Sequence, residues 1–256
     1  MNFGDNMGEL QRRIAATHEG GFRRKKTFEA LAIQKGQKLI DLGCGGGQLV
    51  HEMALAVGET GLVYGLDPSS SQIHAAQEKC SEFKNVEFLQ ESAIKIPLKD
   101  GSCDGLSSIQ ALEYIDDVET VIAEAKRILK SGGRFASVSV LWDHWRFHGP
   151  DKQLNDRIHE VFRAHCPHQM LPFSLTSILE RNGFQGVSLT PLSFINTHLH
   201  ENSFAYFASR TLSLFALKNG IPEEDMMTWN DQLKKADQEG RFGFNSAPVL
   251  TTAIAL

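Results

Sequence analysis

A glycine-rich turn at residues 41–47 constrains the fold of this chain more than any other segment. Its sequence, DLGCGGG, follows a short apolar run and precedes the segment 48–57, where apolar residues recur at the spacing of one helix face. Glycine reaches positive φ without steric cost and lets a ligand approach the backbone, and a helix N-terminus presents oriented N–H groups. The segment therefore predicts a strand–turn–helix unit with a ligand at the turn.

Strand-like and helix-like segments alternate along the rest of the chain. Strands are predicted at 39–43, 62–67, 86–90, 103–109, 134–141, 186–194 and 247–256. Helices are predicted at 48–57, 69–80, 118–130 and 175–184. We expect the third of these helices to end at Gly132-Gly133. Strands of buried character that alternate with helices imply a parallel sheet covered by helices on both faces.

One helical segment precedes this alternation, and two later segments depart from it. Residues 9–31 have helical character, with an expected break at Gly20-Gly21 and a cluster of basic residues around it. Residues 142–172 hold two of the three tryptophans and five of the ten histidines, and residues 195–246 are mostly helical in pattern. We expect the last two segments to be insertions that form a substrate cap over the strand ends. The alternative is that they only enlarge the core.

Composition narrows the class of protein. The 256 residues include 26 Lys and Arg against 31 Asp and Glu, and the formal net charge of −5 disfavours a nucleic-acid binder that relies on bulk charge. No apolar run approaches the roughly 20 residues of a membrane span, and the first residues lack the apolar region of a signal peptide. The sequence has no C-x-x-C or H-E-x-x-H motif, so we expect no metal site and a cytoplasmic protein with reduced thiols.

An acidic residue accompanies the glycine turn. Asp67 ends the second predicted strand, twenty residues after Gly47, where a carboxylate can accept hydrogen bonds from both hydroxyls of a ribose. The alternative is an aspartate that only shapes a turn and caps a helix. A dinucleotide fingerprint requires glycine where Gln48 stands, and Asp41 would repel a pyrophosphate but attract an ammonium or sulfonium group. The pattern therefore favours a positively charged nucleoside over a dinucleotide.

Several landmarks occur in one order along residues 36–140: LIDLGCGGG, VYGLDPSSSQIHAA, NVEFLQESAIKIPLKDGSCDGLSSIQALEYIDD and EAKRILKSGGRF. In these segments, and more weakly at 171–192, the chain resembles the class I S-adenosylmethionine-dependent methyltransferases. It is most similar to the bacterial small-molecule branch that includes the ubiquinone/menaquinone C-methyltransferases. The resemblance implies a Rossmann-like α/β domain at 36–256. Its seven-stranded sheet would be mostly parallel with an antiparallel last strand, and a helical cap would cover it. Residues 1–35 would form a helical segment that closes the site.

The resemblance also implies which residues bind the S-adenosylmethionine cofactor. Gly43, Gly45 and Gly47 would lie under the methionine moiety and the ribose, and Asp41 would face the amino group. Asp67 would bind the ribose, and Gln110 would lie close to the sulfonium. The adenine would be flanked by Pro68, Gln72, Ser92 and Ala93. Ser92 departs from the family pattern, which often has Asp there. Arg23 or Arg24 would reach the cofactor carboxylate, with Arg24 the residue we select; the alternative is a solvated basic face.

Methyl transfer from a sulfonium is an in-line displacement, so a base is needed only if the acceptor must lose a proton early. Histidine suits that role near neutral pH, and we predict His144 first, oriented by Asp143, and then His198. Each of these histidines alone also fits an ordinary surface or capping role. Trp142, Trp145 and Phe147 are candidates to line an apolar or aromatic substrate pocket, and the alternative is that they only pack the core.

The sequence thus predicts an enzyme that transfers methyl to O, N or C of a small, partly apolar metabolite. One rival is an RNA or protein methyltransferase, supported only by the basic N-terminal cluster. A second rival is a non-catalytic protein that keeps the fold, and a third, a nicotinamide-dependent dehydrogenase, is disfavoured by Gln48. The oligomeric state and the acceptor remain open, and no membrane or nucleic-acid partner is expected.

Overall fold

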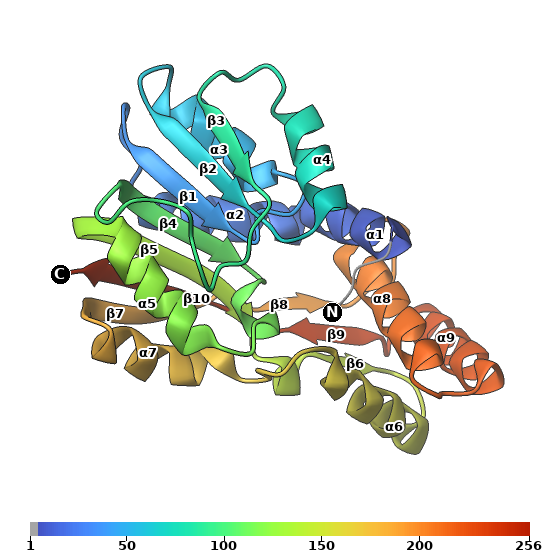
Figure 1. Cartoon of the computed structure of the whole chain (residues 1–256). Coiled ribbons are helices and arrows are strands. Elements are labelled where there is room, and N and C mark those ends of the chain that lie inside the picture. The colour runs from blue at the N-terminus through green and yellow to red at the C-terminus, as the bar shows by residue number, and fades with distance from the viewer. Residues whose placement is uncertain (1–4) are drawn as a thin grey trace.

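A seven-stranded sheet forms the centre of the molecule (Figure 1). The computed structural model describes residues 5–256, with side chains from residue 8 onward. The strands are β1 (Lys38–Leu42), β2 (Leu62–Leu66), β3 (Val86–Leu89), β4 (Cys103–Ile109), β5 (Leu129–Val140), β7 (Phe184–Pro191) and β10 (Pro248–Ala255). Their order is β3-β2-β1-β4-β5-β10-β7, and β10 runs antiparallel to both of its neighbours. The predicted mostly parallel sheet with an antiparallel last strand is confirmed.

Helices cover both faces of this sheet, as predicted (Figure 1). One face packs against α2 (His18–Leu31), α3 (Gln48–Val57) and α4 (Ser70–Lys79), and the other against α5 (Val118–Ile128) and α7 (Leu171–Arg181). The central strands β1, β4 and β5 are buried on both sides over most of their length, whereas the edge strands β3 and β7 are largely exposed or half-buried. Ile40 faces the α5 and α7 layer, and Val63 faces α3. The apolar runs of the central strands follow from this two-sided burial.

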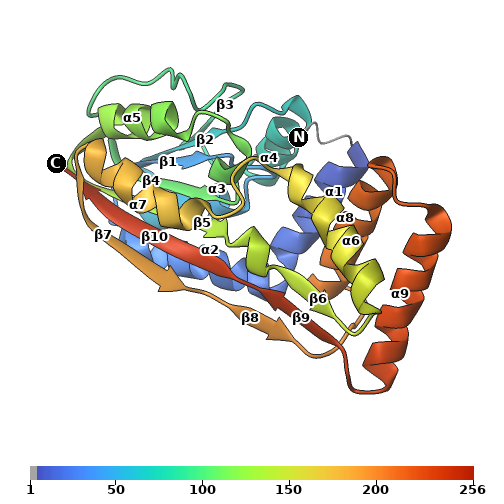
Figure 2. The same cartoon turned by 90° about the horizontal axis from the view of Figure 1, so that it is seen from below.

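Three short strands continue the sheet beyond the ends of β5, β10 and β7. They are β6 (Arg146–His148), β9 (Gly243–Ser246) and β8 (Phe194–Asn196), in the spatial order β6-β9-β8. This order repeats β5-β10-β7 because each short strand is the neighbour in sequence of its long counterpart, as Figure 2 shows for β9 and β10. The sequence pattern did not predict this second sheet.

The short strands carry three helices, and together they form what we call the cap (residues 142–170 and 194–246). Its helices are α6 (Lys152–Phe162), α8 (Phe204–Lys218) and α9 (Glu223–Gln238). The cap also contains two short 3-10 helices, η2 (Trp142–His144) and η3 (Arg163–His165). A third 3-10 helix, η1 (Leu112–Tyr114), lies in the main domain. The cap has a core of its own in which Phe147 stacks on Phe244 with ring centroids 4.2 Å apart, and Trp229 is fully buried. The role of these insertions as a substrate cap stays a prediction.

The N-terminal segment differs from its prediction in one respect. The helix break lies at Thr17, between α1 (Asp5–Ala16) and α2, and Gly20-Gly21 lie inside α2. Thr17 caps α2 by accepting a hydrogen bond from the Gly20 N–H at 3.2 Å. A Cβ at Gly20 would stand 2.5 Å from the carbonyl oxygen of Ala15, so glycine permits the close packing of the two helices rather than a break. Residues 1–4 of the predicted segment 1–35 lie outside the described residues.

A second correction concerns the end of the amphipathic helix predicted at 118–130. The helix α5 ends at Ile128, and Leu129 already pairs with Cys103 in β5, upstream of the glycines expected to stop the helix. The register then shifts between Cys103 and Gly105, so Gly132, at φ +81°, lies in an irregular part of the strand. Leu129 is buried by strand pairing instead of by the helix face.

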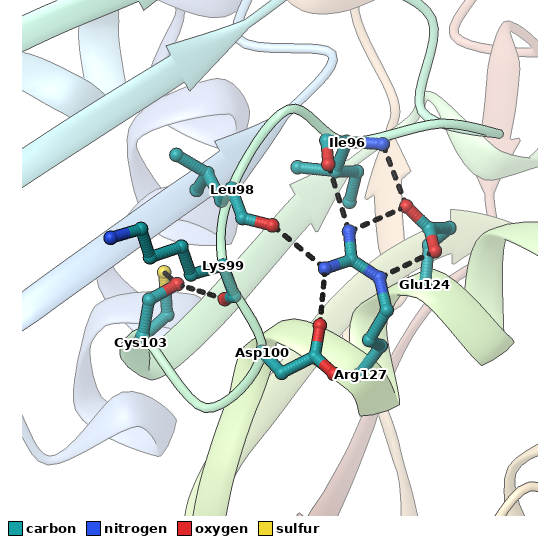
Figure 3. A network of polar contacts seen from close by, with 8 residues as sticks. Ile96, Leu98, Lys99, Asp100, Cys103, Glu124 and Arg127 are labelled. Atoms are coloured by element: carbon teal, nitrogen blue, oxygen red, sulfur yellow. Dashed lines mark hydrogen bonds and ion pairs between the residues drawn. The ribbon is translucent and has the colours of Figure 1, made fainter.

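An arginine on α5 fixes the loop that leads from β3 to β4 (Figure 3). The Arg127 guanidinium donates to the carbonyls of Leu98 and Ile96, at 2.7 and 2.8 Å, and pairs with Asp100 and Glu124. The Glu124 carboxylate also accepts from the N–H of Ile96 at 2.8 Å. Because Ser92 and Ala93 begin the same loop, this network restrains the segment that approaches the candidate site.

Within residues 5–256, the helices all fall short of the length and apolarity that a bilayer crossing requires.

Candidate functional site

A cavity of about 880 Å³ lies where the carboxyl ends of β1, β2, β3 and β4 meet the cap and the N-terminal helices. The ends of these strands and the segments that follow them line one end, including residues 41, 43–46, 67–72 and 109–111. The other end is lined mostly by rings from the cap: Trp142, Trp145, Phe162, His165, Phe204 and Phe215. Residues of α1 and α2 close a third side. The cavity therefore joins a polar end to an aromatic end.

The three predicted glycines of the turn have different roles. Gly43, Gly45 and Gly47 all have positive φ, at +70°, +51° and +76°. A Cβ at Gly43 would stand 2.3 Å from the Cβ of Ala111, and one at Gly47 would stand 2.9 Å from that of Ala76, so both glycines are required by packing. A Cβ at Gly45 would meet no atom within 4 Å, and Gly45 lines the cavity whereas Gly47 does not. Gly45 is therefore the glycine of the turn that has open space over it in the cavity wall, and a ligand contact there stays a prediction.

Asp67 lies in the cavity wall and holds the glycine turn in place. One carboxylate oxygen accepts from the N–H of Gly45 at 3.0 Å, and the other accepts from the N–H of Ser69 at 2.9 Å. Ser69 itself caps α4, so Asp67 shapes the turn but is not the cap of the helix. Burial raises its pKa, and the two backbone donors act in the opposite direction. Each oxygen keeps a lone pair for a ligand hydroxyl.

Asp41 is the second acid at the polar end. It is almost fully buried, accepts a hydrogen bond from Ser107 Oγ at 2.7 Å, and lines the cavity. Burial raises the pKa of Asp41 to about 7, although the Ser107 hydrogen bond favours the ionised form. A cationic group placed in the cavity would favour the ionised carboxylate further.

Four residues predicted at the adenine side all line the cavity: Pro68, Gln72, Ser92 and Ala93. Gln72 also connects α4 to α1, because its side-chain oxygen accepts from Arg12 at 3.3 Å and its nitrogen donates to Gln11 at 3.2 Å. Arg12 lies against the turn, since a Cβ on Gly46 would stand 2.9 Å from Arg12 Cδ. The sequence reasoning did not single out Arg12, which only the packing of α1 brings to the site.

Arg23 and Arg24 both line the cavity, but their surroundings differ. Arg24 pairs with Glu52 at 2.8 Å and donates to the carbonyl of Ala15. Arg23 is 1% exposed, with its guanidinium carbon 4.7 Å from the centroid of the Phe204 ring. Burial lowers the pKa of Arg23 to about 10. The selection of Arg24 stays a prediction, and the geometry favours its neighbour.

Arg23 is held by two side chains from distant segments. It donates to Gln110 Oε1 and, at 3.0 Å, to Ser246 Oγ, while its Nε has no hydrogen-bond partner within residues 5–256. Gln110 follows β4 with φ +52°, which is rare for a residue with a side chain, and donates its N–H to Val138 at 2.7 Å. Such backbone strain persists where surrounding contacts fix it, and it is common at ligand sites.

A buried glutamate behind this pair was missed by the sequence reasoning. Glu113 is fully buried and accepts from Ser139 Oγ at 2.9 Å and from the N–H of Val140 at 3.4 Å. Burial raises its pKa to about 7, and the positive charge of Arg23 acts in the opposite direction. The segment QALEY contains this acid, but its burial depends on how η1 packs against β5, which the sequence does not show.

The two histidines predicted as bases lie away from the cavity wall. His144 lies in η2, where its carbonyl accepts from Asn245 at 2.8 Å, and His198 is exposed, 3.4 Å from Asp237. Neither is among the described residues that line the cavity, so a catalytic role for either stays a prediction that this geometry does not support. Trp142 and Trp145 do line the cavity, whereas Phe147 lies in the core of the cap.

The histidine that lines the cavity is His165. It follows Phe162 by three residues, and the two rings stack with centroids 4.2 Å apart. That spacing puts two side chains on one side of a helical turn, which is the signal that could have identified His165.

As for metal sites, no group of three or more His, Cys, Asp or Glu residues converges within residues 5–256. The expectation of no metal stays a prediction.

The model of the methyltransferase domain family matches residues 33–211 of the chain. The chain belongs to the methyltransferase family. An O-methyltransferase of Aspergillus nomiae is 29% identical over 167 residues, which cover 64% of this chain and 71% of that protein. A demethylmenaquinone methyltransferase of Lactococcus lactis is 36% identical over 117 residues, 45% of this chain and 46% of that one. An uncharacterised transposon protein of Streptomyces fradiae, 30% identical over 180 residues, is matched over 70% of this chain and 48% of its own length. The chain thus spans about half the length of two of these relatives.

Solved methyltransferases share the fold. A geranyl diphosphate methyltransferase in complex with S-adenosylmethionine superposes with a TM-score of 0.60 at 17% identity, over 100% of this chain and 93% of that chain. At this identity, the likeness shows the fold alone. The resemblance to class I S-adenosylmethionine-dependent methyltransferases predicted from the sequence is confirmed.

Proposed function

We propose that this protein transfers a methyl group from S-adenosylmethionine to an O, N or C atom of a small, partly apolar metabolite. The observation that carries the proposal is the cavity of about 880 Å³, which runs from the glycine turn and its acids to a wall of aromatic rings. Such a volume lies within the range of small-molecule sites. We expect it to hold a nucleoside at the polar end and an apolar acceptor at the other.

The residues present fit the cofactor. Open space over Gly45 and an acid on either side of it suit a nucleoside that carries an ammonium and a ribose. Asp41 would face the ammonium, and Asp67 would accept from the ribose hydroxyls while it holds the turn. Pro68, Gln72, Ser92 and Ala93 would flank the adenine. Gly43 and Gly47 shape the turn through packing.

We assign the cofactor carboxylate to Arg23 in place of Arg24. The Nε of Arg23 is buried without a hydrogen-bond partner in the described part of the chain, and Gln110 orients the guanidinium from the end of β4. A buried guanidinium with an unmet donor is stabilised by an anion. Arg24 already pairs with Glu52, so less of its charge is free to act on a ligand.

The cofactor, when bound, supplies an activated methyl group. The chain contributes by alignment and by exclusion of water, because helices α1 and α2 close one side of the cavity and the rings of the cap close another. Positioning of this kind lowers the barrier of an in-line transfer without a covalent intermediate on the protein.

The basic N-terminal cluster does not favour a nucleic-acid substrate. Arg13 pairs with Glu9 at 2.8 Å, Lys26 pairs with Glu29 at 2.8 Å, and Arg23 is buried. Much of the cluster is therefore neutralised or inaccessible to phosphates. The names of two relatives, an O-methyltransferase and a demethylmenaquinone methyltransferase, also support a small-molecule acceptor.

Calorimetry with S-adenosylhomocysteine, the demethylated product, tests the proposal. We expect stoichiometric binding of S-adenosylhomocysteine and no binding of NAD at the same concentration. Turnover would then be followed with S-adenosylmethionine labelled in the methyl group and a panel of aromatic acceptors. Failure of S-adenosylhomocysteine to bind would overturn the proposed function.

A further inference from the structure

Two buried polar atoms in the aromatic wall of the cavity have no hydrogen-bond partner within residues 5–256. They are Nε1 of Trp142 and Nε2 of His165. Both residues line the cavity, and their rings are neighbours, with centroids 4.3 Å apart at an angle of 77°. An unmet buried donor or acceptor costs about 1–3 kcal/mol, so such atoms call for an explanation.

The hydrogen-bond partner of Nδ1 determines which ring nitrogen of His165 carries the hydrogen. Nδ1 lies 2.7 Å from the carbonyl oxygen of Phe162, and a carbonyl can only accept, so Nδ1 carries a hydrogen. Burial lowers the pKa of His165 to about 4, so the ring is neutral at pH 7. Nε2 therefore presents a lone pair, and it acts as a hydrogen-bond acceptor.

Trp142 supplies the complementary group. An indole N–H can only donate. The backbone N–H of Trp142 donates to the carbonyl of Gln169 at 2.8 Å, which fixes the main chain there. The indole ring packs against the rings of Phe162 and Trp145, with centroids 6.1 and 5.7 Å away. The wall thus places one fixed donor beside one fixed acceptor, among rings that disfavour charge.

The chemistry of the two atoms selects the group that meets them. A carboxylate offers no donor, an ammonium offers no acceptor, and either charge would lose its hydration beside these rings. A ketone only accepts. A neutral hydroxyl donates and accepts through one oxygen, so it can satisfy both atoms.

We propose that Trp142 and His165 form a hydroxyl-binding subsite, and that the methyl acceptor is a neutral phenol or alcohol with an apolar body. This inference rests on the proposed function and names the substrate class for the same cavity. It makes Trp142 and His165 specificity-determining residues, independently of which acceptor atom receives the methyl group.

A pair of probes that differ in one group tests the subsite. The probes are 1-naphthol and 1-methylnaphthalene, titrated into full-length protein saturated with S-adenosylhomocysteine. We expect the parent protein to bind 1-naphthol about tenfold more tightly, which is the effect of one or two well-placed hydrogen bonds. The substitutions His165→Phe and Trp142→Phe keep a ring but remove the acceptor or the donor. Each should reduce the preference several-fold and leave the affinity for 1-methylnaphthalene unchanged.

Two further variants separate a specific role from a structural one. Trp145→Phe removes an indole from the same wall, but Trp145 is not one of the residues with an unmet buried atom, so both probes should be affected equally. His165→Gln keeps an acceptor near the position of Nε2 and should restore part of the preference. Thermal unfolding of each variant checks that the fold is retained.

The outcomes that overturn the subsite are distinct from those that overturn the proposed function. An unchanged preference in both His165→Phe and Trp142→Phe, or a parent protein that binds neither probe or shows no preference, would refute the subsite. If S-adenosylhomocysteine itself fails to bind, the proposed function fails first. Binding of S-adenosylhomocysteine without a hydroxyl preference would refute the subsite alone.

Discussion

Substitution of Gly45 by alanine isolates the contact between the glycine turn and a ligand. Gly45 has φ +51°, and a Cβ there meets no atom of the protein within 4 Å. Gly101 provides a matched control, because it has φ +58°, its Cβ would also meet nothing within 4 Å, and it does not line the cavity. The two substitutions therefore impose the same backbone strain and differ only in what lies over the new methyl group.

The magnitudes follow from this geometry. An alanine at positive φ costs about 1–2 kcal/mol of folding stability, so Gly45→Ala and Gly101→Ala should lower the unfolding free energy by similar amounts. The hydrogen bond from the Gly45 N–H to Asp67 is retained because it uses the backbone. A methyl group forced against a bound ligand costs about 1–3 kcal/mol, on the order of 5-fold to 150-fold in the dissociation constant.

Calorimetric titration with S-adenosylhomocysteine, together with urea unfolding, measures both quantities. We expect Gly45→Ala to weaken binding by at least fivefold, and Gly101→Ala to bind as the parent protein does. Equal affinity of the Gly45→Ala variant and the parent would show that the turn does not touch the cofactor, and the assignment of the polar end would be wrong.

Three other predictions concern charged groups. Asp67→Asn should weaken binding of S-adenosylhomocysteine by about tenfold or more, because a charge-assisted hydrogen bond is lost; calorimetry that shows unchanged affinity would remove the ribose assignment. Arg23→Lys should weaken the same binding while Arg24→Lys leaves it within about twofold, since an ammonium cannot reproduce the fixed donors of a guanidinium; the opposite ranking would favour Arg24. Burial raises the pKa of Glu113 from 4.5 to about 7, so between those values the folded protein keeps a proton that the unfolded chain releases. Stability should therefore fall as pH rises from 5 to 7, by up to about 1.4 kcal/mol per pH unit, and Glu113→Gln should lessen this fall; equal slopes in urea unfolding would contradict the assignment.

Local sequence periodicity was sufficient for most of the sheet and its helices. The predicted helix 48–57 and strand 103–109 have the bounds that the structure shows. The helix carries apolar residues at the spacing of one face between Gly47 and Gly58, and the strand begins shortly after the turn at Asp100-Gly101. The end of α5 was misplaced because Leu129 fits a helix face and a strand equally well, and only pairing with Cys103 decides between them. The small sheet was missed because strands of three or four residues carry no readable alternation.

In the candidate site too, some residues could be predicted from the sequence and others could not. The glycine turn and Asp67 are close in sequence to the strands that position them, so their place at the cavity follows from topology. The arginine and histidine assignments depend on tertiary packing. Whether Arg23 or Arg24 is buried is set by the rotation of α2 about its axis. Whether His144 or His165 reaches the cavity is set by how η2, α6 and η3 pack within the cap.

The continuity of the two sheets determines which side of the molecule can open. The junctions between them carry backbone hydrogen bonds, from Leu141 N–H to Ala247 at 2.9 Å and from Leu192 N–H to Pro248 at 2.8 Å, so the insertions cannot swing outward without breaking the ladder. Helix α1 is attached to the opposite wall through side chains, chiefly the contacts of Gln11 and Arg12 with Gln72. We therefore expect metabolites to enter and leave past α1. Amide hydrogen exchange should be faster along that helix than in β6 or β9, and should slow when the nucleoside is bound.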